Sequence, residues 1–342
     1  MDIELFDYAL PQHLIAQKPH IPRDECKLMV YNKTNKVIEH RIFKDITSYL
    51  KKGDLLILNN TKVIPARIFA KKDTGGKIEL FLLEEMSFNK YLCITKGKIK
   101  DKTRAFLKNN EEILIEKTDS DKRIVTFLSN KNVKECLQTI GEVPLPPYIK
   151  RDYNSYDKEN DFNNYQTVFA KKEGAVAAPT AGIHFTKELL DNLHIKGVKI
   201  AYITLHVGIG TFRPVKEKTI ENHKMHEERY EISAETAKIF NQTKMQKNRI
   251  VAVGTTAVRA LESSANRKGY IHPTTSKTDI FIYPGYKYKA VDAMITNFHL
   301  PKSTLLMMIS AFSSREEILD CYRNAIDNNY RFFSFGDAMF IY

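Results

Sequence analysis

Residues 174–215 decide the fold: GAVAAPTAGIHFT (174–186) precedes an amphipathic segment, and VKIAYITLHVGIGTFRPV (198–215) follows it. Each contains a short apolar run, typical of a buried strand, that ends in a loop with glycine and histidine. Such loops at strand ends are where α/β enzymes place their chemistry. Their polar residues are Thr180, His184, His206, Thr211 and Arg213. Almost no acidic residue lies between them, which predicts a site for a nucleotide-like or anionic molecule.

The sequence after Tyr165 alternates apolar strand-like runs with helix-like segments. Near-continuous apolar strands between helices are typical of a mainly parallel sheet with helices on both faces. We therefore expect an α/β fold. The expected strands are 174–178, 198–207, 249–254, 279–283 and 331–342. The expected helices are 187–196, 234–247, 255–264, 303–312 and 314–327.

The segment 66–150 has a different texture, with five or six short β-type runs separated by charged turns. Regular short strands without long helices indicate a small β-barrel or sandwich. We interpret it as an inserted all-β domain, which makes the α/β domain discontinuous, over 1–65 and 151–342. In the first part of that domain, 27–43 is expected to form a hairpin and 55–58 a buried strand.

The composition is basic, with 53 Lys and Arg against 41 Asp and Glu, a net charge of +12. This excess favours a large polyanion such as RNA, although lysines spread along the chain are equally typical of a solvated surface. The four cysteines form no CxxC pair and no zinc spacing, so we expect no disulfide, no metal and a reducing, cytoplasmic location. The longest apolar run is far too short to cross a membrane.

Two strand-to-helix turns carry hydroxyl or basic residues. Thr255 follows Gly254 at the expected start of a helix, where exposed amides bind phosphate or carboxylate. Lys302 follows Pro301 at the start of another helix. Ordinary helix capping explains threonine and serine at such positions equally well.

The glycines Gly208 and Gly210 do not make a dinucleotide-binding motif, because a third glycine is missing and Pro214 prevents a helix from following. They indicate a strand end that bends close to a ligand. A lone histidine such as His206 is more often structural than catalytic. The pair His223 and His226 is weak evidence for a metal, and a catalytic or RNA-facing segment is the preferred interpretation.

Polar and basic residues also gather where the inserted segment joins the rest of the chain. Substrate sites favour such junctions, and a plain hinge is the alternative. The candidates near the two junctions are Asn59, Asn60, Thr61, Lys62 and Arg67 at the first, and Lys150 and Arg151 at the second.

These motifs together resemble one family, the S-adenosylmethionine:tRNA ribosyltransferase-isomerases of queuosine biosynthesis. The matching segments occur in family order across nearly the whole chain. They are FDYALPQHLIAQKP (6–19), IPRDECKLMV (21–30), LLILNNTKVIPARI (55–68), GEVPLPPYIKR (141–151), YQTVFAKKEGAVAAPTAGIHFT (165–186), TLHVGIGTFRPV (204–215), HKMHEERYEIS (223–233), VAVGTTAVRALES (251–263), TDIFIYPGY (278–286), ITNFHLPKSTLLMMISAF (295–312) and FSFGDAMFI (333–341).

The resemblance implies a three-layer α/β/α domain with an inserted β-barrel, and monomer as the family expectation. It also implies transfer and isomerisation of the ribosyl group of S-adenosylmethionine onto 7-aminomethyl-7-deazaguanine at the tRNA wobble position. The product would be epoxyqueuosine, with adenine and methionine released. S-adenosylmethionine is then a substrate, and no metal or redox cofactor is implied.

This chemistry needs a base, an acid for adenine and donors for sugar oxygens, and histidine serves as either base or acid. The leading candidates are His184 and His206, followed by His226 and His299, and the sequence leaves their division of roles open. Candidates for substrate contacts are Asn59, Arg67, Thr180, Gly208, Gly210, Arg213, Thr255, Arg259, Asp292 and Lys302, with Asp337 as a further carboxylate. Candidates for tRNA phosphate contacts are Lys62, Lys150 and Arg151, with Arg67 shared between the two sets.

Two other functions compete. An S-adenosylmethionine-dependent RNA methyltransferase would share both substrates, but it requires a glycine-rich loop after the first strand of a Rossmann unit, and this sequence has none. A non-catalytic RNA-binding module built on the β segment conflicts with the size and the polar strand ends of the α/β part.

Overall fold

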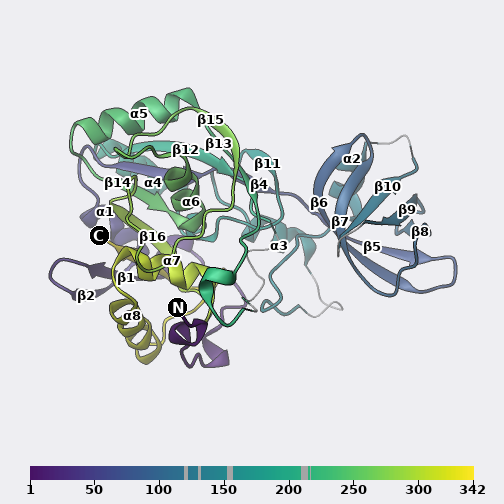
Figure 1. Ribbon diagram of the computed structural model, residues 1–342, viewed down its shortest axis with the longest axis horizontal. Coiled ribbons are helices and arrows are strands. Elements are labelled where there is room, and N and C mark those ends of the chain that lie inside the picture. The colour runs from purple at the N-terminus through teal and green to yellow at the C-terminus, as the bar shows by residue number, and fades with distance from the viewer. Residues whose placement is uncertain (119–121, 130–131, 152–156, 209–214, 216) are drawn as a thin grey trace.

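The computed structural model describes residues 1–118, 122–129, 132–151, 157–208, 215 and 217–342. The larger body is an α/β domain, and a β-barrel projects from one end of it, with β4, β11 and α3 between the two (Figure 1). The fold class predicted from the sequence is confirmed.

A nine-stranded sheet forms the middle layer of the α/β body, in the order β15-β13-β12-β3-β14-β16-β17-β1-β2. Its four central strands, β12, β3, β14 and β16, are parallel neighbours. Antiparallel pairs occur toward both edges, and β17 with β1 adds one more parallel pair. The strands are β1 (Lys27–Asn32), β2 (Val37–Ile42), β3 (Leu55–Asn59), β12 (Lys199–Leu205), β13 (Glu228–Ile232), β14 (Ile250–Val253), β15 (Thr274–Thr278), β16 (Ala293–Asn297) and β17 (Ala338–Ile341).

Alternating side chains of the central strands build two separate cores, one on each face. Leu55 and Ile57 of β3 pack with residues of α5, α6, α7 and α8, whereas Leu56 and Leu58 pack with α1 and α4. Because successive side chains of a strand point to opposite faces, an unbroken apolar run requires cover on both. These helices are α1 (Ile46–Tyr49), α4 (Lys187–Ile195), α5 (Ala234–Met245), α6 (Gly254–Ser264), α7 (Thr304–Phe312) and α8 (Arg315–Asp327).

Side-chain caps define the helix starts that the sequence signals predicted. Thr186 accepts a hydrogen bond from the amide of Leu189 at 3.1 Å and begins α4. Ser303 accepts from the amide of Leu306 at 3.2 Å and begins α7. Such caps satisfy amides that have no partner within the helix.

The strand predicted at 279–283 is wrong. The edge strand β15 ends at Thr278, and the amide of Ile280 bonds to the Thr278 hydroxyl at 3.1 Å instead of to a neighbouring strand. Ile282 then turns into the core of the α/β body. The segment is therefore apolar because it is a loop that packs against the core, and not because it pairs in the sheet.

The barrel is closed and antiparallel, in the order β10-β7-β6-β5-β8-β9. Residues of α2 pack into its apolar core. Its elements are β5 (Arg67–Lys72), β6 (Lys77–Ser87), β7 (Lys90–Lys96), β8 (Thr103–Leu107), β9 (Glu112–Lys117), β10 (Arg123–Phe127) and α2 (Val133–Ile140).

Two short parallel strands and a helix lie between barrel and body: β4 (Thr61–Val63), β11 (Lys172–Ala175) and α3 (Lys158–Asn164). Single turns of 3-10 helix complete the described elements. They are η1 (Ile3–Phe6), η2 (Gln12–Leu14), η3 (Arg23–Glu25), η4 (Phe43–Asp45), η5 (Thr180–Gly182) and η7 (Ile220–Asn222).

Candidate active site

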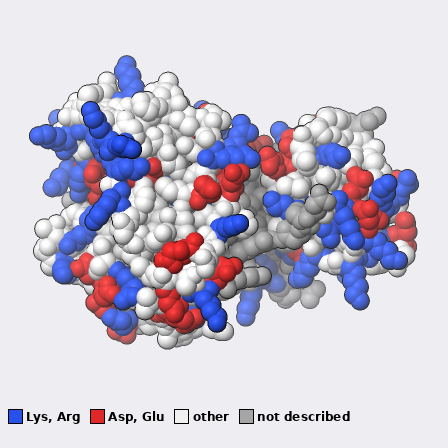
Figure 2. All heavy atoms as spheres, in the orientation of Figure 1, with Lys and Arg blue, Asp and Glu red and all other residues white. Residues whose placement is uncertain are grey.

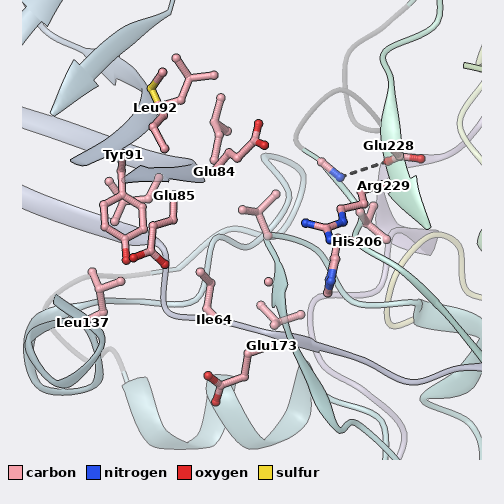
Figure 3. Close-up of a pocket in the computed structure, with 18 of the residues that line it drawn as sticks. Ile64, Glu84, Glu85, Tyr91, Leu92, Leu137, Glu173, His206, Glu228 and Arg229 are labelled. Atoms are coloured by element: carbon pink, nitrogen blue, oxygen red, sulfur yellow. Dashed lines mark hydrogen bonds between the residues drawn. The ribbon is translucent and has the colours of Figure 1, made fainter. Parts of the chain in front are cut away.

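A cleft of about 890 Å³ lies between the barrel and the α/β body. Its barrel wall comes from β6, β7 and α2, and its other wall comes from β4, β11, β13 and the segment after β12 (Figure 3). Cavities of this size between two structural units are the usual place for small-molecule sites. The cleft is therefore the candidate active site.

His206, directly after β12, lies in the cleft wall and is half-buried. Its Nδ1 lies 2.8 Å from the hydroxyl oxygen of Thr61 on β4. Burial lowers the pKa of His206, and the positive charges of Arg229 and Lys172 lower it further, against an opposing effect of Glu231. The ring is consequently neutral at pH 7, as a general base must be.

Gly208 follows His206 on the same wall, and its amide donates a hydrogen bond to Glu228 of β13 at 3.0 Å (Figure 3). The other carboxylate oxygen of Glu228 forms an ion pair with Arg259 of α6, and both side chains are about 95% buried. Arg259 also donates to the carbonyl of Thr278 at 3.3 Å. Arg259, one of the candidates for substrate contacts, is therefore paired with Glu228, which follows His226 in the segment 223–233.

Asn59 joins three elements at the end of β3. Its side-chain oxygen accepts from the amide of Leu205 at 3.0 Å, and its side-chain nitrogen donates to the carbonyl of Leu205 at 2.9 Å. The same nitrogen donates to the Thr256 hydroxyl at 3.2 Å. Asn59 thereby fixes the end of β12 that carries His206. Thr255, which precedes Thr256 in the chain, is buried in the first turn of α6.

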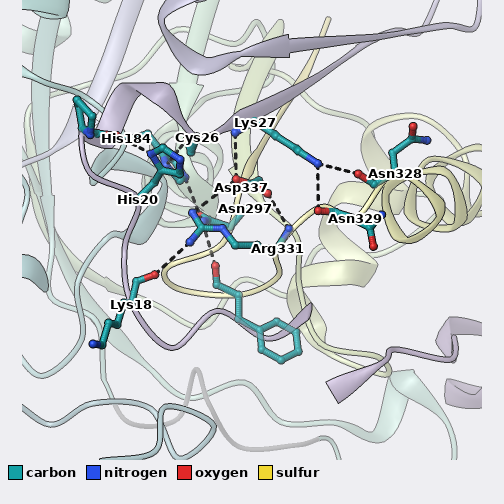
Figure 4. Close-up of polar contacts among 12 residues, drawn as sticks. Lys18, His20, Cys26, Lys27, His184, Asn297, Asn328, Asn329, Arg331 and Asp337 are labelled. Carbon is teal, nitrogen blue, oxygen red and sulfur yellow. Dashed lines mark hydrogen bonds and ion pairs between the residues drawn. The ribbon is translucent and has the colours of Figure 1, made fainter. Parts of the chain in front are cut away.

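His184 occupies a second polar centre, shown in Figure 4, and the described residues that line the cleft do not include it. It is 4% exposed. Its Nδ1 lies 3.2 Å from the sulfur of Cys26, and its Nε2 lies 3.1 Å from the side-chain nitrogen of Asn297, whose oxygen accepts from Thr180 at 3.3 Å. Burial, reinforced by Arg331 nearby, lowers the pKa of His184 to about 3. Thr180 and His184 therefore belong to a buried network.

His299 is likewise held within the fold, because its Nε2 lies 2.8 Å from the Thr296 hydroxyl and its backbone bonds to the hydroxyls of Tyr8 and Tyr322. Burial lowers the pKa of His299 to about 3. His226, in contrast, is exposed in the cleft wall. Of the four candidate histidines, the cleft brings together His206 and His226.

Other predicted contacts are dispersed. Asp292 precedes β16, at the opposite end of the parallel strands from Asn59, and accepts from the amide of Ile250 at 2.8 Å. Lys302 pairs with Glu4 at 2.7 Å, on the N-terminal turn. Asp337 is buried and accepts from the amides of Lys27 and Arg331 (Figure 4).

The basic residues at the junction are mostly paired. Lys62 lies in the cleft wall and pairs with Glu173 at 3.0 Å. Arg67 pairs with Glu79 at 2.5 Å, and Arg151 pairs with Asp161 at 2.7 Å. Lys150 is exposed. Gly210, Thr211 and Arg213 lie outside the described residues.

Among the described residues, the face in Figure 2 shows no single basic patch. Lysine and arginine side chains are mixed with acidic side chains on both the body and the barrel.

The described parts of the chain contain no group of three or more His, Cys, Asp or Glu placed to hold a metal ion. No helix among them is long and apolar enough to span a membrane. The four cysteines are buried and unpaired with one another.

The barrel also contributes cleft residues that are not among the candidates predicted from the sequence. Glu84 and Glu85 of β6 line the cleft, and so does Phe88, which is 76% exposed. They occur in a run that reads as an ordinary barrel strand, so no local signal separates them from surface residues. Thr61, in contrast, belongs to the polar run 59–62 whose position at a strand end beside the junction indicated a substrate site.

Comparisons with known proteins agree over the full length. The family model for "Queuosine biosynthesis protein" matches residues 3–341. The S-adenosylmethionine:tRNA ribosyltransferase-isomerase of Caldanaerobacter subterraneus subsp. tengcongensis is 53% identical over 341 residues, covering 98% of both chains. The protein of the same name from Sulfurihydrogenibium sp. is 53% identical over 349 residues, covering 100% of both. The crystal structure of the S-adenosylmethionine tRNA ribosyltransferase from Thermotoga maritima is 37% identical, covers 99% of this chain and 100% of that one, and superimposes with a TM-score of 0.56.

Proposed function

Because this chain belongs to the family of queuosine biosynthesis proteins, we propose that it transfers and isomerises the ribosyl group of S-adenosylmethionine onto a 7-aminomethyl-7-deazaguanine base at the wobble position of tRNA. The chain is an enzyme of the transferase class that acts in queuosine modification of tRNA. The products of the proposed reaction are epoxyqueuosine in tRNA, adenine and methionine. We further propose that it works in the cytoplasm as a monomer and needs no cofactor besides its substrate S-adenosylmethionine.

The observation that carries this proposal is the position of His206 in a cleft large enough for a nucleoside. The sulfonium of S-adenosylmethionine makes the adjacent C5′ protons of the ribose acidic. We assign His206 as the base that removes one of them, because its lowered pKa keeps the ring neutral. Adenine then leaves, and His226 on the same wall is the candidate acid that protonates it.

The aminomethyl nitrogen must attack in its unprotonated form, and an alkoxide on the sugar then closes to the epoxide and expels neutral methionine. The cationic parts of S-adenosylmethionine require anionic or aromatic partners. Glu84, Glu85 and Tyr91 on the barrel wall supply such groups (Figure 3). Opposite them stands the wall that carries His206, so the cleft offers a base and cation-binding groups on facing sides.

The deciding experiment measures adenine released when the purified protein is mixed with S-adenosylmethionine and precursor tRNA. Stoichiometric adenine, with the ribosyl carbons found in the tRNA, is the expected result. Release of S-adenosylhomocysteine with methylated tRNA would instead identify a methyltransferase. Binding of tRNA without any product would identify a non-catalytic RNA-binding protein.

A further inference from the structure

The imidazole ring of His206 is held on two sides by the pair of strands that connects the body to the barrel. The hydroxyl of Thr61 on β4 lies 2.8 Å from Nδ1. On β11, a Cβ added at Gly174 would lie 3.0 Å from Cε1 and 3.1 Å from Nδ1 of the ring. The ring therefore lies between the Thr61 hydroxyl, which is within hydrogen-bond distance, and the backbone of Gly174, which has no side chain.

The local structure of β11 explains how the backbone comes so close. Lys172 pairs with Thr61 and Ala175 pairs with Val63, and the register shifts between Glu173 and Ala175. Gly174 lies in this irregularity with a φ of +138°, a conformation that favours glycine. The irregularity turns the chain against the ring, and the absence of a side chain leaves room for the imidazole.

The two ring nitrogens of His206 have different surroundings. Thr61 is fully buried, and its hydroxyl has a second neighbour, the carbonyl oxygen of Lys172 at 3.5 Å. A hydroxyl that points its proton at that carbonyl can accept a hydrogen bond from Nδ1–H. Among the described residues, Thr61 is the hydrogen-bond partner of the ring, through Nδ1, and none of these residues bonds to Nε2.

We propose that Thr61 is a positioning residue that holds His206 in the tautomer with its proton on Nδ1, and so presents an unprotonated Nε2 to the cleft. The hydrogen bond on one ring nitrogen sets which form the other takes. When Nε2 gains a proton, the bond from Nδ1–H to Thr61 persists, so the ring neither rotates nor changes partner. The role given to His206 rests on the proposed function, whereas the tautomer is a property of the free protein.

The test is ¹⁵N NMR of the histidine rings in the free protein, with the His206 signals assigned from His206→Asn. The expected result is a protonated Nδ1 and an unprotonated Nε2 in the wild type. Thr61→Val, which keeps the shape but loses the hydroxyl, shifts His206 toward the Nε2–H form. Thr61→Ser restores the wild-type signals. A wild-type ring with its proton on Nε2, or a Thr61→Val ring identical to wild type, overturns the proposal.

Single-turnover adenine release gives the second readout. Thr61→Val lowers the rate constant roughly tenfold, the scale of one lost hydrogen bond, leaves tRNA binding unchanged and alters the pH profile, while Thr61→Ser recovers the rate. The matched control is Thr204→Val, which removes another buried hydroxyl, one that donates to Asn60 at 2.7 Å. A Thr204→Val rate reduced as much as that of Thr61→Val would assign the loss to folding and overturn the positioning role. A wild type that releases no adenine refutes the proposed function, while the NMR result still tests Thr61.

Discussion

Glu228 and Arg259 form a buried ion pair between β13 of the sheet and α6, and the same carboxylate accepts a hydrogen bond from the amide of Gly208 in the cleft wall. The pair therefore ties the wall that carries His206 to the core of the α/β body. Removing one member of such a pair leaves the other as a buried charge without a partner, which strongly destabilises the folded state.

Replacing Glu228 with Gln leaves Arg259 buried without a counter-charge. We expect the free energy of unfolding to fall by about 3–5 kcal/mol, measured by chemical denaturation. The matched change Asp320→Asn breaks the exposed pair with Arg323 and should cost about 0–1 kcal/mol. Equal losses in the two variants would show that the buried pair does not stabilise the fold.

His206→Ala should slow adenine release by about 10²–10⁴-fold in single turnover, the usual contribution of general acid–base catalysis. The affinity for tRNA should stay the same, because the ring acts on the ribose. Fluorescence anisotropy with labelled tRNA checks the second point. Near wild-type adenine release by His206→Ala would remove this residue from the mechanism.

His184 makes stability depend on pH. Its pKa is about 3 in the fold and about 6.5 in an unfolded chain, so below pH 6.5 the unfolded state binds a proton that the folded state does not. The contribution of His184 to the stability of the folded state is therefore fully present above about pH 6.5, and it declines as the pH falls toward 3. The free energy of unfolding should therefore fall between pH 7 and pH 5, as measured by chemical denaturation at each pH. In His184→Gln this fall should be smaller by up to about 1.4 kcal/mol per pH unit. Identical slopes would contradict a neutral, buried His184.

Phe88 lines the cleft and is 76% exposed, so we expect it to stack on a base of the bound tRNA. Phe88→Ala should weaken tRNA binding by about 1–3 kcal/mol, the scale of one base–aromatic contact. Leu128→Ala, a change at a 46% exposed barrel residue that does not line the cleft, is the control among the described residues. Comparable affinities for the two variants would place the RNA elsewhere.

Binding of tRNA should also weaken steeply as salt is raised, because counterions are released from the phosphates. The measurement is the slope of log Kd against log salt concentration, in wild type and in Lys150→Ala. Removing one phosphate contact reduces the slope by about 0.7–0.9. A flat response in the wild type would contradict phosphate contacts by the basic residues.

Gly174→Ala should displace the His206 ring, because the new methyl group would lie 3.0 Å from Cε1 and the φ of +138° is strained for alanine. The expected result is slower adenine release with a lowered melting temperature. Gly285→Ala is the control, since it shares a positive φ of +105° but has no atom within 4 Å of the added Cβ. If both variants release adenine at the same rate, contact with the ring is unimportant.

Much of the fold could be predicted from patterns that are local in the sequence. The apolar run 55–58 indicated a buried strand, Thr186 indicated a helix start, and the short β runs of 66–150 indicated a barrel or sandwich. The edge strand was misplaced at 279–283, because a loop whose apolar residues pack into the core has the same composition as a strand.

The candidate site, too, could be predicted only in part from the sequence. The sequence by itself determined the family, most of the strands and helices, and the histidine-bearing loops, since these depend on segments that are continuous in the chain. Only the tertiary structure decided that His206 and His226 share a cleft, while His184 is buried and His299 is held by hydrogen bonds outside the cleft. The physical reason is burial and pairing: whether a histidine reaches a substrate depends on what folds over it, and the residues that enclose His184, such as Cys26 and Asn297, come from distant parts of the chain.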